Sequence, residues 1–286
     1  MNFPQTASEE HIAFYGAGSM AEAIVRGMIH RSVVNPGQIS MINRSNREHL
    51  EYLTNRYGVV TGQDPAAKNE LLRGASIIIL AMKPKDAGEA IGQLRPLLSE
   101  HQLIVSLIAG LSISTIQHLL GRKQPIARTM PNTSSSIGLG ATGISFSPEA
   151  DARQRQAALS IFEAVGSVAV IDEDKQEILT GVSGSGPAYI YYMMEAMIAA
   201  GIEGGLSPEQ ARDLTVQTVL GAASMMKETG EDPAKLRKDI TSPNGSTQAA
   251  LEVLADKGFT ETVKAAVHRC AERSREMGES VRESLL

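Results

Sequence analysis

Residues 12–21 read Ile-Ala-Phe-Tyr-Gly-Ala-Gly-Ser-Met-Ala and carry the clearest architectural signal in the chain. A short apolar strand runs into a Gly-x-Gly-x-x-Ala turn, and Met20–Ile29 continues with apolar residues at helical spacing. Gly16 allows a tight turn, Gly18 lets the backbone approach a pyrophosphate, and Ala21 lets the helix pack on the strand. The pattern predicts a dinucleotide-binding unit in which the cofactor contacts Gly16, Ala17, Gly18, Ser19 and Met20.

The second predicted strand, Ile39–Ile42, ends in Asn43-Arg44-Ser45. A site specific for NAD usually places Asp or Glu here, because a carboxylate binds the ribose 2′-hydroxyl. A guanidinium and a hydroxyl stand in that place instead, and both suit a 2′-phosphate. Asn43, Arg44 and Ser45 are therefore predicted to contact NADP(H), with NAD(H) as a less favoured cofactor. The alternative is that Arg44 is only a solvated surface charge.

Strand and helix patterns alternate from residue 11 to about residue 172. Ser76–Ala81 is a continuous apolar run, as expected of a strand buried on both faces of a parallel sheet. Further strands are predicted at 103–108, 125–129 and 167–171, with crossover helices at 47–57, 65–72, 86–98 and 114–120. Such alternation is typical of a doubly wound α/β domain that binds ligands at the carboxyl ends of its strands. We therefore predict a Rossmann-like domain over residues 1–172.

The pattern changes after Asp172. Segments at 187–200, 208–228 and 260–286 carry apolar residues at helical spacing, and no strand pattern follows. The long, narrow apolar seam of Thr260–Leu286 suits packing against another helix. The Met-rich face of Tyr191–Met197 is typical of a core or a dimer interface. Residues 173–286 are predicted to form an all-helical domain, so the fold class is α/β followed by all-α.

Composition narrows the classes of function. The 286 residues are 42% hydrophobic and 21% charged, as is ordinary for a globular protein, and the net charge of −5 argues against a nucleic-acid partner. Cys270 is alone and the six histidines lack metal-ligand spacing, so we expect no internal disulfide and no metal site. No apolar run is long enough to cross a membrane, and the polar segment Met1–Glu10 is unlike a signal peptide. These features predict a cytoplasmic protein.

A second informative stretch is Ser242-Pro243-Asn244-Gly245-Ser246-Thr247, which precedes an apolar-periodic run. Pro243 and Gly245 predict a tight turn, and Ser246 or Thr247 is expected to cap the helix that follows. The free N–H groups and the positive dipole end of that helix suit a small carboxylate. Taken alone, the stretch favours an ordinary capped loop over a ligand site.

Six sequence blocks, in order, resemble the pyrroline-5-carboxylate reductase family. They are Gly16–Ala21, Ala81-Met82-Lys83-Pro84, Ser106–Gly110, Arg128–Thr133, Ser183–Tyr189 and Pro233–Leu254. Met82 and Asn244 depart from the valine and glycine that are commoner in the family. The resemblance implies an N-terminal Rossmann-like domain, a helical domain that interlocks with a second copy, and a homodimer or a larger ring of dimers.

The resemblance also implies an activity, the reduction of 1-pyrroline-5-carboxylate to L-proline with NAD(P)H. It implies cofactor contacts from Ala81, Met82, Lys83, Pro84, Ala109 and Gly110, the last two beneath the nicotinamide. Ser242, Gly245, Ser246 and Thr247 would bind the substrate carboxylate, and Thr247, the residue nearest to catalytic, would also hydrogen-bond the ring nitrogen.

Two alternatives to this activity stay open. One is a related imine or β-hydroxyacid reductase, although residues 187–200 hold no lysine that could serve as its acid and base. The other is an NADP-binding regulator without catalysis, against which the intact stretch Ser242–Thr247 argues.

Overall fold

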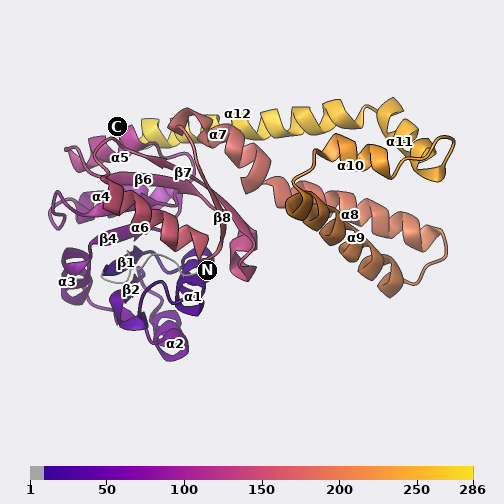
Figure 1. Cartoon of the computed structure of the whole chain (residues 1–286). Coiled ribbons are helices and arrows are strands. Elements are labelled where there is room, and N and C mark those ends of the chain that lie inside the picture. Colours follow the sequence, from indigo (N-terminus) through magenta and orange to yellow (C-terminus); the bar gives the residue numbers. More distant parts are fainter. Residues whose placement is uncertain (1–9, 286) are drawn as a thin grey trace. The chain divides into compact units, whose positions relative to one another are not determined.

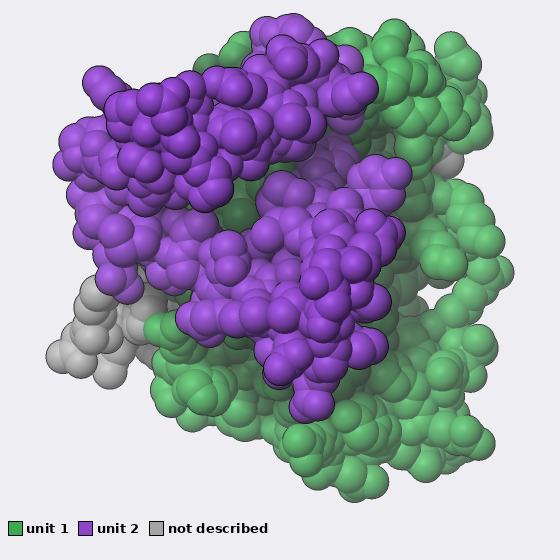
Figure 2. Space-filling model, turned by 90° about the vertical axis from the view of Figure 1, so that its right-hand side faces the viewer, with its two compact units in different colours: residues 1–185, 269–286 green, residues 186–268 purple. Residues whose placement is uncertain are grey.

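The computed structural model describes residues 10–285, and the chain divides into two compact units. Unit 1 comprises Met1–Ser185 together with Arg269–Leu286, and unit 2 comprises Gly186–His268. Figure 1 labels the elements along the chain, and Figure 2 colours the two units separately. The division by packing differs from the sequence boundary at residues 172 and 173, because the end of the chain belongs to the first unit. The signal-peptide expectation concerns Met1–Glu10, of which residues 1–9 lie outside the described part.

Unit 1 is built on an eight-stranded sheet with the order β3-β2-β1-β4-β5-β6-β7-β8. The strands are β1 (Ile12–Tyr15), β2 (Ile39–Ile42), β3 (Val60–Gly62), β4 (Ile77–Leu80), β5 (Leu103–Ser106), β6 (Ile126–Met130), β7 (Gly140–Phe146) and β8 (Gly166–Val170). Neighbouring strands are parallel except for β6 and β7, which are antiparallel. The strand order reverses between β1 and β4, which is where a doubly wound sheet binds its ligand. The predicted Rossmann-like fold is confirmed.

Helices cover both faces of this sheet (Figure 1). One hydrophobic cluster draws on α1 (Ser19–His30), α2 (Arg47–Tyr57) and α6 (Ala152–Glu163), and the other on α3 (Pro65–Gly74), α4 (Ala87–Leu94) and α5 (Ile113–Leu120). Strand β4 shows why two clusters form. Its four residues are all buried, with Ile77 and Ile79 in the first cluster and Ile78 and Leu80 in the second. Alternate side chains point to opposite faces, so an unbroken apolar strand requires a core on each side.

The sequence patterns do not predict β3, β7 and α6. Strand β3 has only three residues, and β7 reads Gly-Ala-Thr-Gly-Ile-Ser-Phe, in which the buried Thr142 and Ser145 replace an apolar run. The helix expected over residues 86–98 is shorter. It forms as the 3₁₀ turn η3 (Pro84–Asp86) followed by α4, which ends at Leu94 because Pro96 has no N–H to continue the hydrogen-bond ladder.

Helices joined by short loops make up unit 2. It contains α8 (Gly186–Glu203), α9 (Pro208–Thr229), α10 (Pro233–Asp239), α11 (Ser246–Asp256) and the beginning of α12 (Phe259–Leu285). Ser207 caps α9, because its hydroxyl accepts a hydrogen bond from the Gln210 N–H while the Gln210 side chain accepts one from the Ser207 N–H. Gly201 allows α8 to pack closely against Ala211 of α9. The predicted all-helical character of this region is confirmed.

No helix in residues 10–285 combines the length and the apolar character needed to cross a bilayer. No group of three His, Cys, Asp or Glu side chains in the same range is arranged to hold a metal ion.

Candidate active site

The glycine-rich turn lies where β1, β2 and β4 end. Gly16 has a φ of +114°, a conformation that side chains other than glycine rarely adopt, and its N–H donates to the Ile42 carbonyl at 2.8 Å. A Cβ at Gly16 would collide with the Ala81 carbonyl. Gly18 caps α1 in an extended conformation, and a Cβ there would meet nothing within 4 Å. The turn thus packs tightly on one side and leaves the start of α1 open to a ligand.

His49 of α2 also supports this turn. Its Nε2 donates to the Ala17 carbonyl at 2.9 Å, and its ring stacks on Tyr52 with the centroids 5.9 Å apart. Tyr57 donates to the Glu22 carboxylate at 2.9 Å, and burial, followed by that carboxylate, raises the pKa of Tyr57 to about 12. The phenol therefore stays protonated and ties α2 to α1. The sequence reasoning missed His49, because nothing in its spacing distinguishes it from a surface residue.

The residues after β2 lie at the same edge of the sheet. Arg44 is 76% exposed, and its guanidinium nitrogens lie 3.6 Å from one carboxylate oxygen of Asp86 and 3.6 Å from one of Glu89. Asn43 shapes the loop, because its amide group exchanges two hydrogen bonds with the backbone of Asn46. Asn46 in turn caps α2. Arg44 is thus an exposed cation at the edge of the turn, while Asn43 has a structural part in holding that edge.

The segment after β4 completes this edge. The Ala81 N–H donates to the Tyr15 carbonyl at 2.9 Å, so the chain leaves β4 beside the glycine turn. Lys83 and Pro84 then lead into η3, where proline suits the first helical position. Tyr15 donates its hydroxyl to Gln93 at 3.1 Å, and burial, reinforced by the charge of Glu89, raises the pKa of this phenol. Tyr15 is therefore a neutral donor next to Gly16.

The loop after β5 is the fourth predicted cofactor segment. The Leu107 N–H donates to the Leu80 carbonyl at 3.0 Å, which brings this loop beside β4. Gly110 has a φ of +75°, so the loop turns sharply there. A small pocket opens at this point, lined among others by Ile108, Ala109, Gly110, Arg128, Gln176 and Thr180. Unit 1 therefore gathers all four predicted cofactor segments at the carboxyl ends of its strands.

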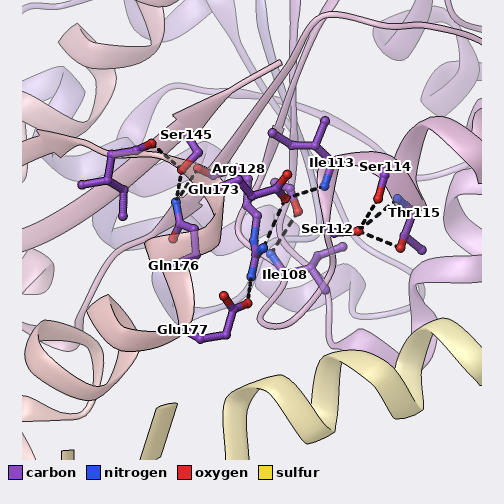
Figure 3. Close-up of polar contacts among 12 residues, drawn as sticks. Ile108, Ser112, Ile113, Ser114, Thr115, Arg128, Ser145, Glu173, Gln176 and Glu177 are labelled. Atoms are coloured by element: carbon purple, nitrogen blue, oxygen red, sulfur yellow. Dashed lines mark hydrogen bonds and ion pairs between the residues drawn. The ribbon is translucent and has the colours of Figure 1, made fainter. Parts of the chain in front are cut away.

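A buried ionic cluster lies beside this pocket, and Figure 3 shows its geometry. Arg128 has a side chain only 8% exposed, and its two terminal nitrogens lie 3.2 Å from Glu173 and 2.8 Å from Glu177. The Glu173 carboxylate also accepts from the Ile113 N–H at 2.7 Å. The Gln176 amide donates to the Arg128 carbonyl at 3.2 Å. The cluster joins β6, the start of α5 and the segment around α7 (Gln176–Leu179).

Sequence reasoning assigned no role to this cluster. The sequence features from which it could have been predicted are a single arginine inside a buried strand and two glutamates four residues apart. Such charges are paired when buried, because an isolated charge in an apolar interior is costly.

In unit 2, the stretch Ser242–Thr247 forms the predicted tight turn. Asn244 has a φ of +59°, which asparagine tolerates better than other non-glycine residues, and the Gly245 N–H donates to the Ser242 carbonyl at 3.1 Å. The expected capping by Ser246 or Thr247 is wrong. Gly245 is the N-cap residue of α11 and has no side chain to offer, so Ser246 already lies in the first turn. The first N–H groups of α11 are consequently left without a side-chain cap.

Cys270 is not arranged as a nucleophile. Its thiol is partly buried and donates to the Ser185 hydroxyl at 3.3 Å. A hydroxyl is not a base that could remove the thiol proton, so this contact serves packing in α12.

Comparison with known proteins agrees with both the glycine-turn region of unit 1 and the helical region that follows it. Residues 11–110 match a family model described as NADP oxidoreductase coenzyme F420-dependent, and residues 173–277 match one described as pyrroline-5-carboxylate reductase dimerisation. Pyrroline-5-carboxylate reductase 2 of Bacillus subtilis (strain 168) is 44% identical, over 94% of this chain and 95% of that protein. The chain belongs to the pyrroline-5-carboxylate reductase family.

Solved structures of pyrroline-5-carboxylate reductases share the whole fold. The enzyme of Coxiella burnetii is 38% identical, with a TM-score of 0.88 over 93% of this chain and 98% of that one. A Plasmodium falciparum pyrroline carboxylate reductase, solved with NADP bound, is 29% identical with a TM-score of 0.84, over 95% and 99% of the two chains. The family resemblance inferred from the sequence blocks is confirmed.

Proposed function

We propose that this chain reduces 1-pyrroline-5-carboxylate to L-proline with a nicotinamide cofactor, the last step of proline biosynthesis. The observation that carries the proposal is the full-length likeness to pyrroline-5-carboxylate reductases, which spans both the glycine turn of unit 1 and the Ser242–Thr247 turn of unit 2. A chain selected only to bind the dinucleotide would need the first of these turns and not the second.

The residues of unit 1 fit a nicotinamide dinucleotide. The open backbone at Gly18 and the uncapped start of α1 suit a pyrophosphate, because N–H groups and the helix dipole both favour negative charge there. Ala17, Ser19 and Met20 border this position. Ala81, Met82, Lys83 and Pro84 would flank the ribose and nicotinamide side, and Ala109 and Gly110 would lie beneath the nicotinamide. When bound, the cofactor supplies a hydride to the C5 carbon of the substrate.

The finer proposal is a preference for NADP(H) over NAD(H). Arg44 stands where an NAD-specific site would carry a carboxylate, and Ser45 adds a hydroxyl donor. The ion pairs of Arg44 with Asp86 and Glu89 are exposed, and such pairs contribute little free energy. A 2′-phosphate carries about two negative charges and accepts paired hydrogen bonds from a guanidinium, so it competes well for Arg44.

Substrate binding is assigned to the start of α11. The uncapped N–H groups of Ser246 and Thr247 can donate to the substrate carboxylate, next to the positive end of the helix dipole. Ser242 and Gly245 set the turn that exposes these groups. The half-buried Thr247 carries the hydroxyl that would donate to or accept from the ring nitrogen. Little acid–base catalysis is required, because the protonated cyclic imine is already electrophilic, and catalysis rests on alignment.

We also propose that the working form is a homodimer built through unit 2. Within the chain, Ala211 and Thr215 are the only buried residues of this unit. Large apolar side chains are exposed instead, among them Tyr191, Tyr192 and Leu220 at 58%, 78% and 52%. A helical unit that buries so little of its own surface requires another copy to complete its core. Cytoplasmic location remains the sequence-based prediction.

The activity is tested by following NADP⁺ reduction at alkaline pH with L-proline as the sole donor, where the equilibrium is drawn toward oxidation. Proline-dependent formation of NADPH is the expected result. The matched control replaces L-proline with D-proline, because a carboxylate held at α11 fixes the hand of the ring. Absence of turnover with L-proline, in protein that binds NADPH, would leave the regulator hypothesis standing instead.

A further inference from the structure

The last helix of the chain ends against the loop that follows β5. From Arg269 onward, α12 belongs to unit 1. Gly278 of α12 and Gly110 of the loop touch through their backbones. A Cβ on Gly278 would lie 2.6 Å from the Gly110 carbonyl oxygen and 3.2 Å from its Cα, and a Cβ on Gly110 would lie 2.8 Å from the Gly278 Cα. Neither position has room for a side chain, so this approach depends on two glycines.

The contact is part of a wider packed face and is not an isolated approach. Ser274, Gly278 and Val281 follow one another at four- and three-residue steps and therefore share a face of α12. The Ser274 carbonyl oxygen would lie 3.6 Å from a Cβ on Gly110. Val281 packs against the hydrophobic cluster that contains Ile108 and Leu111, the residues on either side of Ala109 and Gly110. Val281 thus packs against the same hydrophobic cluster as the two residues that flank the loop tip.

The loop itself has few other constraints at its tip. Ile108 and Leu111 are almost fully buried, at 2% and 1% exposure, and the Ile108 N–H donates to the Ser106 hydroxyl at 3.3 Å. Ala109 and Gly110 are only half-buried and line the small pocket next to Arg128. Gly110 adopts a positive φ, and because it has no Cβ its backbone can reach more conformations than that of its neighbours. The backbone of Gly278 is therefore the rigid surface that limits where the tip can lie.

We propose that Gly278 is a positioning residue for the reaction: by letting α12 approach Gly110, it fixes the backbone of Ala109 and Gly110 beneath the nicotinamide. The inference rests on the proposed function, because it takes these two residues as the floor of the nicotinamide site. A side chain at residue 278 would push the floor toward the cofactor and shift the nicotinamide relative to the substrate. Displacements of about 1 Å can lower turnover by about a hundredfold.

The test compares three glycine-to-alanine variants within helices of unit 1. Gly278→Ala introduces the clash with Gly110. Gly92→Ala is the control for helix propensity, because Gly92 lies in α4 and an added Cβ would meet nothing within 4 Å. Gly27→Ala is the control for strain, because a Cβ in the last turn of α1 would collide with Val165 and lie 3.0 Å from the Ala164 carbonyl oxygen, away from the β5 loop. Each variant is measured as the full-length protein.

Three readouts separate positioning from general damage. We expect Gly278→Ala to lower kcat about tenfold or more, with the KM for NADPH within about threefold of wild type. The isotope effect with NADPH deuterated at C4 should rise, since hydride transfer becomes more rate-limiting. Affinity for 2′-phospho-ADP-ribose, which lacks the nicotinamide, should not change. Gly92→Ala and Gly27→Ala should keep the wild-type kcat and isotope effect. Equal losses in Gly27→Ala and Gly278→Ala, or a wild-type kcat in Gly278→Ala, would overturn the proposal.

Val281→Ala covers the case in which Gly278→Ala does not fold. This variant loosens the packing of α12 against the loop at Ala109 and Gly110 without introducing a clash. We expect kcat to fall about two- to fivefold and the isotope effect to increase. The emission of bound NADPH provides a readout that does not need turnover, because it reports the surroundings of the nicotinamide. A changed emission in either variant supports the proposal even if the wild-type protein lacks reductase activity, and an unchanged emission together with an unchanged isotope effect contradicts it.

Discussion

The two units of the chain differ in how much of their structure each completes by itself. Unit 1 has a hydrophobic cluster on each face of its sheet, and the glycine turn is fixed there by Ile42, Ala81 and His49. Unit 2 buries only Ala211 and Thr215, and its turn at Ser242–Thr247 is held by contacts within the turn and with Gln248. The proposed cofactor side is thus preformed within one chain, whereas the proposed substrate side depends on what covers unit 2. Cofactor affinity and substrate turnover should therefore respond to different substitutions.

The largest expected effect concerns the exposed apolar face of unit 2. Leu220→Asp places a carboxylate where we expect the partner's helices to pack. An uncompensated buried charge costs about 3–5 kcal/mol, so the dimer should dissociate at micromolar concentration. Sedimentation velocity and thermal unfolding at several concentrations measure this. Gln217→Glu is the control, since it adds the same charge at a position that is already polar. A dimer that survives Leu220→Asp unchanged would show that unit 2 completes its core in another way.

The next effect lies on the cofactor side. Arg44→Asp removes a charge-assisted contact to the 2′-phosphate and adds repulsion, which should shift discrimination between NADPH and NADH by about 2–4 kcal/mol. The KM for NADPH should rise far more than the KM for NADH, and oligomeric state should stay as in the wild type. Steady-state kinetics with both cofactors provide the test. Equal losses with both would remove Arg44 from the 2′-phosphate site.

On the substrate side, Thr247→Ala removes a hydroxyl and leaves the backbone N–H in place. We expect kcat/KM to fall about ten- to a thousandfold, which corresponds to about 1.4–4 kcal/mol, because the ring nitrogen loses its partner. NADPH affinity, measured by fluorescence titration, should hardly change, since the glycine turn belongs to unit 1. Thr247→Ser is the rescue variant, because it restores the hydroxyl. Full activity in Thr247→Ala would reduce this residue to a structural part of α11.

The smallest effect is expected at the single cysteine. Cys270→Ala removes a thiol that donates only to Ser185, so kcat should stay near the wild-type value and the free energy of unfolding should fall by about 1 kcal/mol. Thermal unfolding and steady-state kinetics check the two halves of this prediction. A collapse of kcat at unchanged stability would reveal a nucleophile that the geometry does not suggest.

Sequence patterns predicted the parts of the chain in which local chemistry decides the outcome. β1, β2 and α2 follow directly from apolar runs, glycine turns and helix caps. The sequence patterns failed where contacts between residues far apart in the sequence decide the structure. Strand β7 has no apolar run: its buried Ser145 stands opposite Arg128 of β6 and its buried Thr142 opposite Val168 of β8. The end of α12 packs back into unit 1 through Gly278. The capping error at α11 has a local cause instead, because the turn geometry around Asn244 moves the start of the helix by one or two residues.

The candidate site shows the same division. The glycine turn, Arg44 and the loop at Ala109 and Gly110 were accessible from motifs and family resemblance. Arg128 with its two glutamates, and His49 on the Ala17 carbonyl, were not, because their partners lie 32 to 49 residues away in the sequence. Such pairings exist only once the fold is formed.

The most direct measurement of the central claim follows the hydride itself. The protein is incubated with 1-pyrroline-5-carboxylate and NADPH carrying deuterium at the transferable C4 position, and the product is analysed by mass spectrometry and NMR. The account predicts L-proline with a single deuterium on C5. Unlabelled proline, or consumption of NADPH without proline, would contradict it.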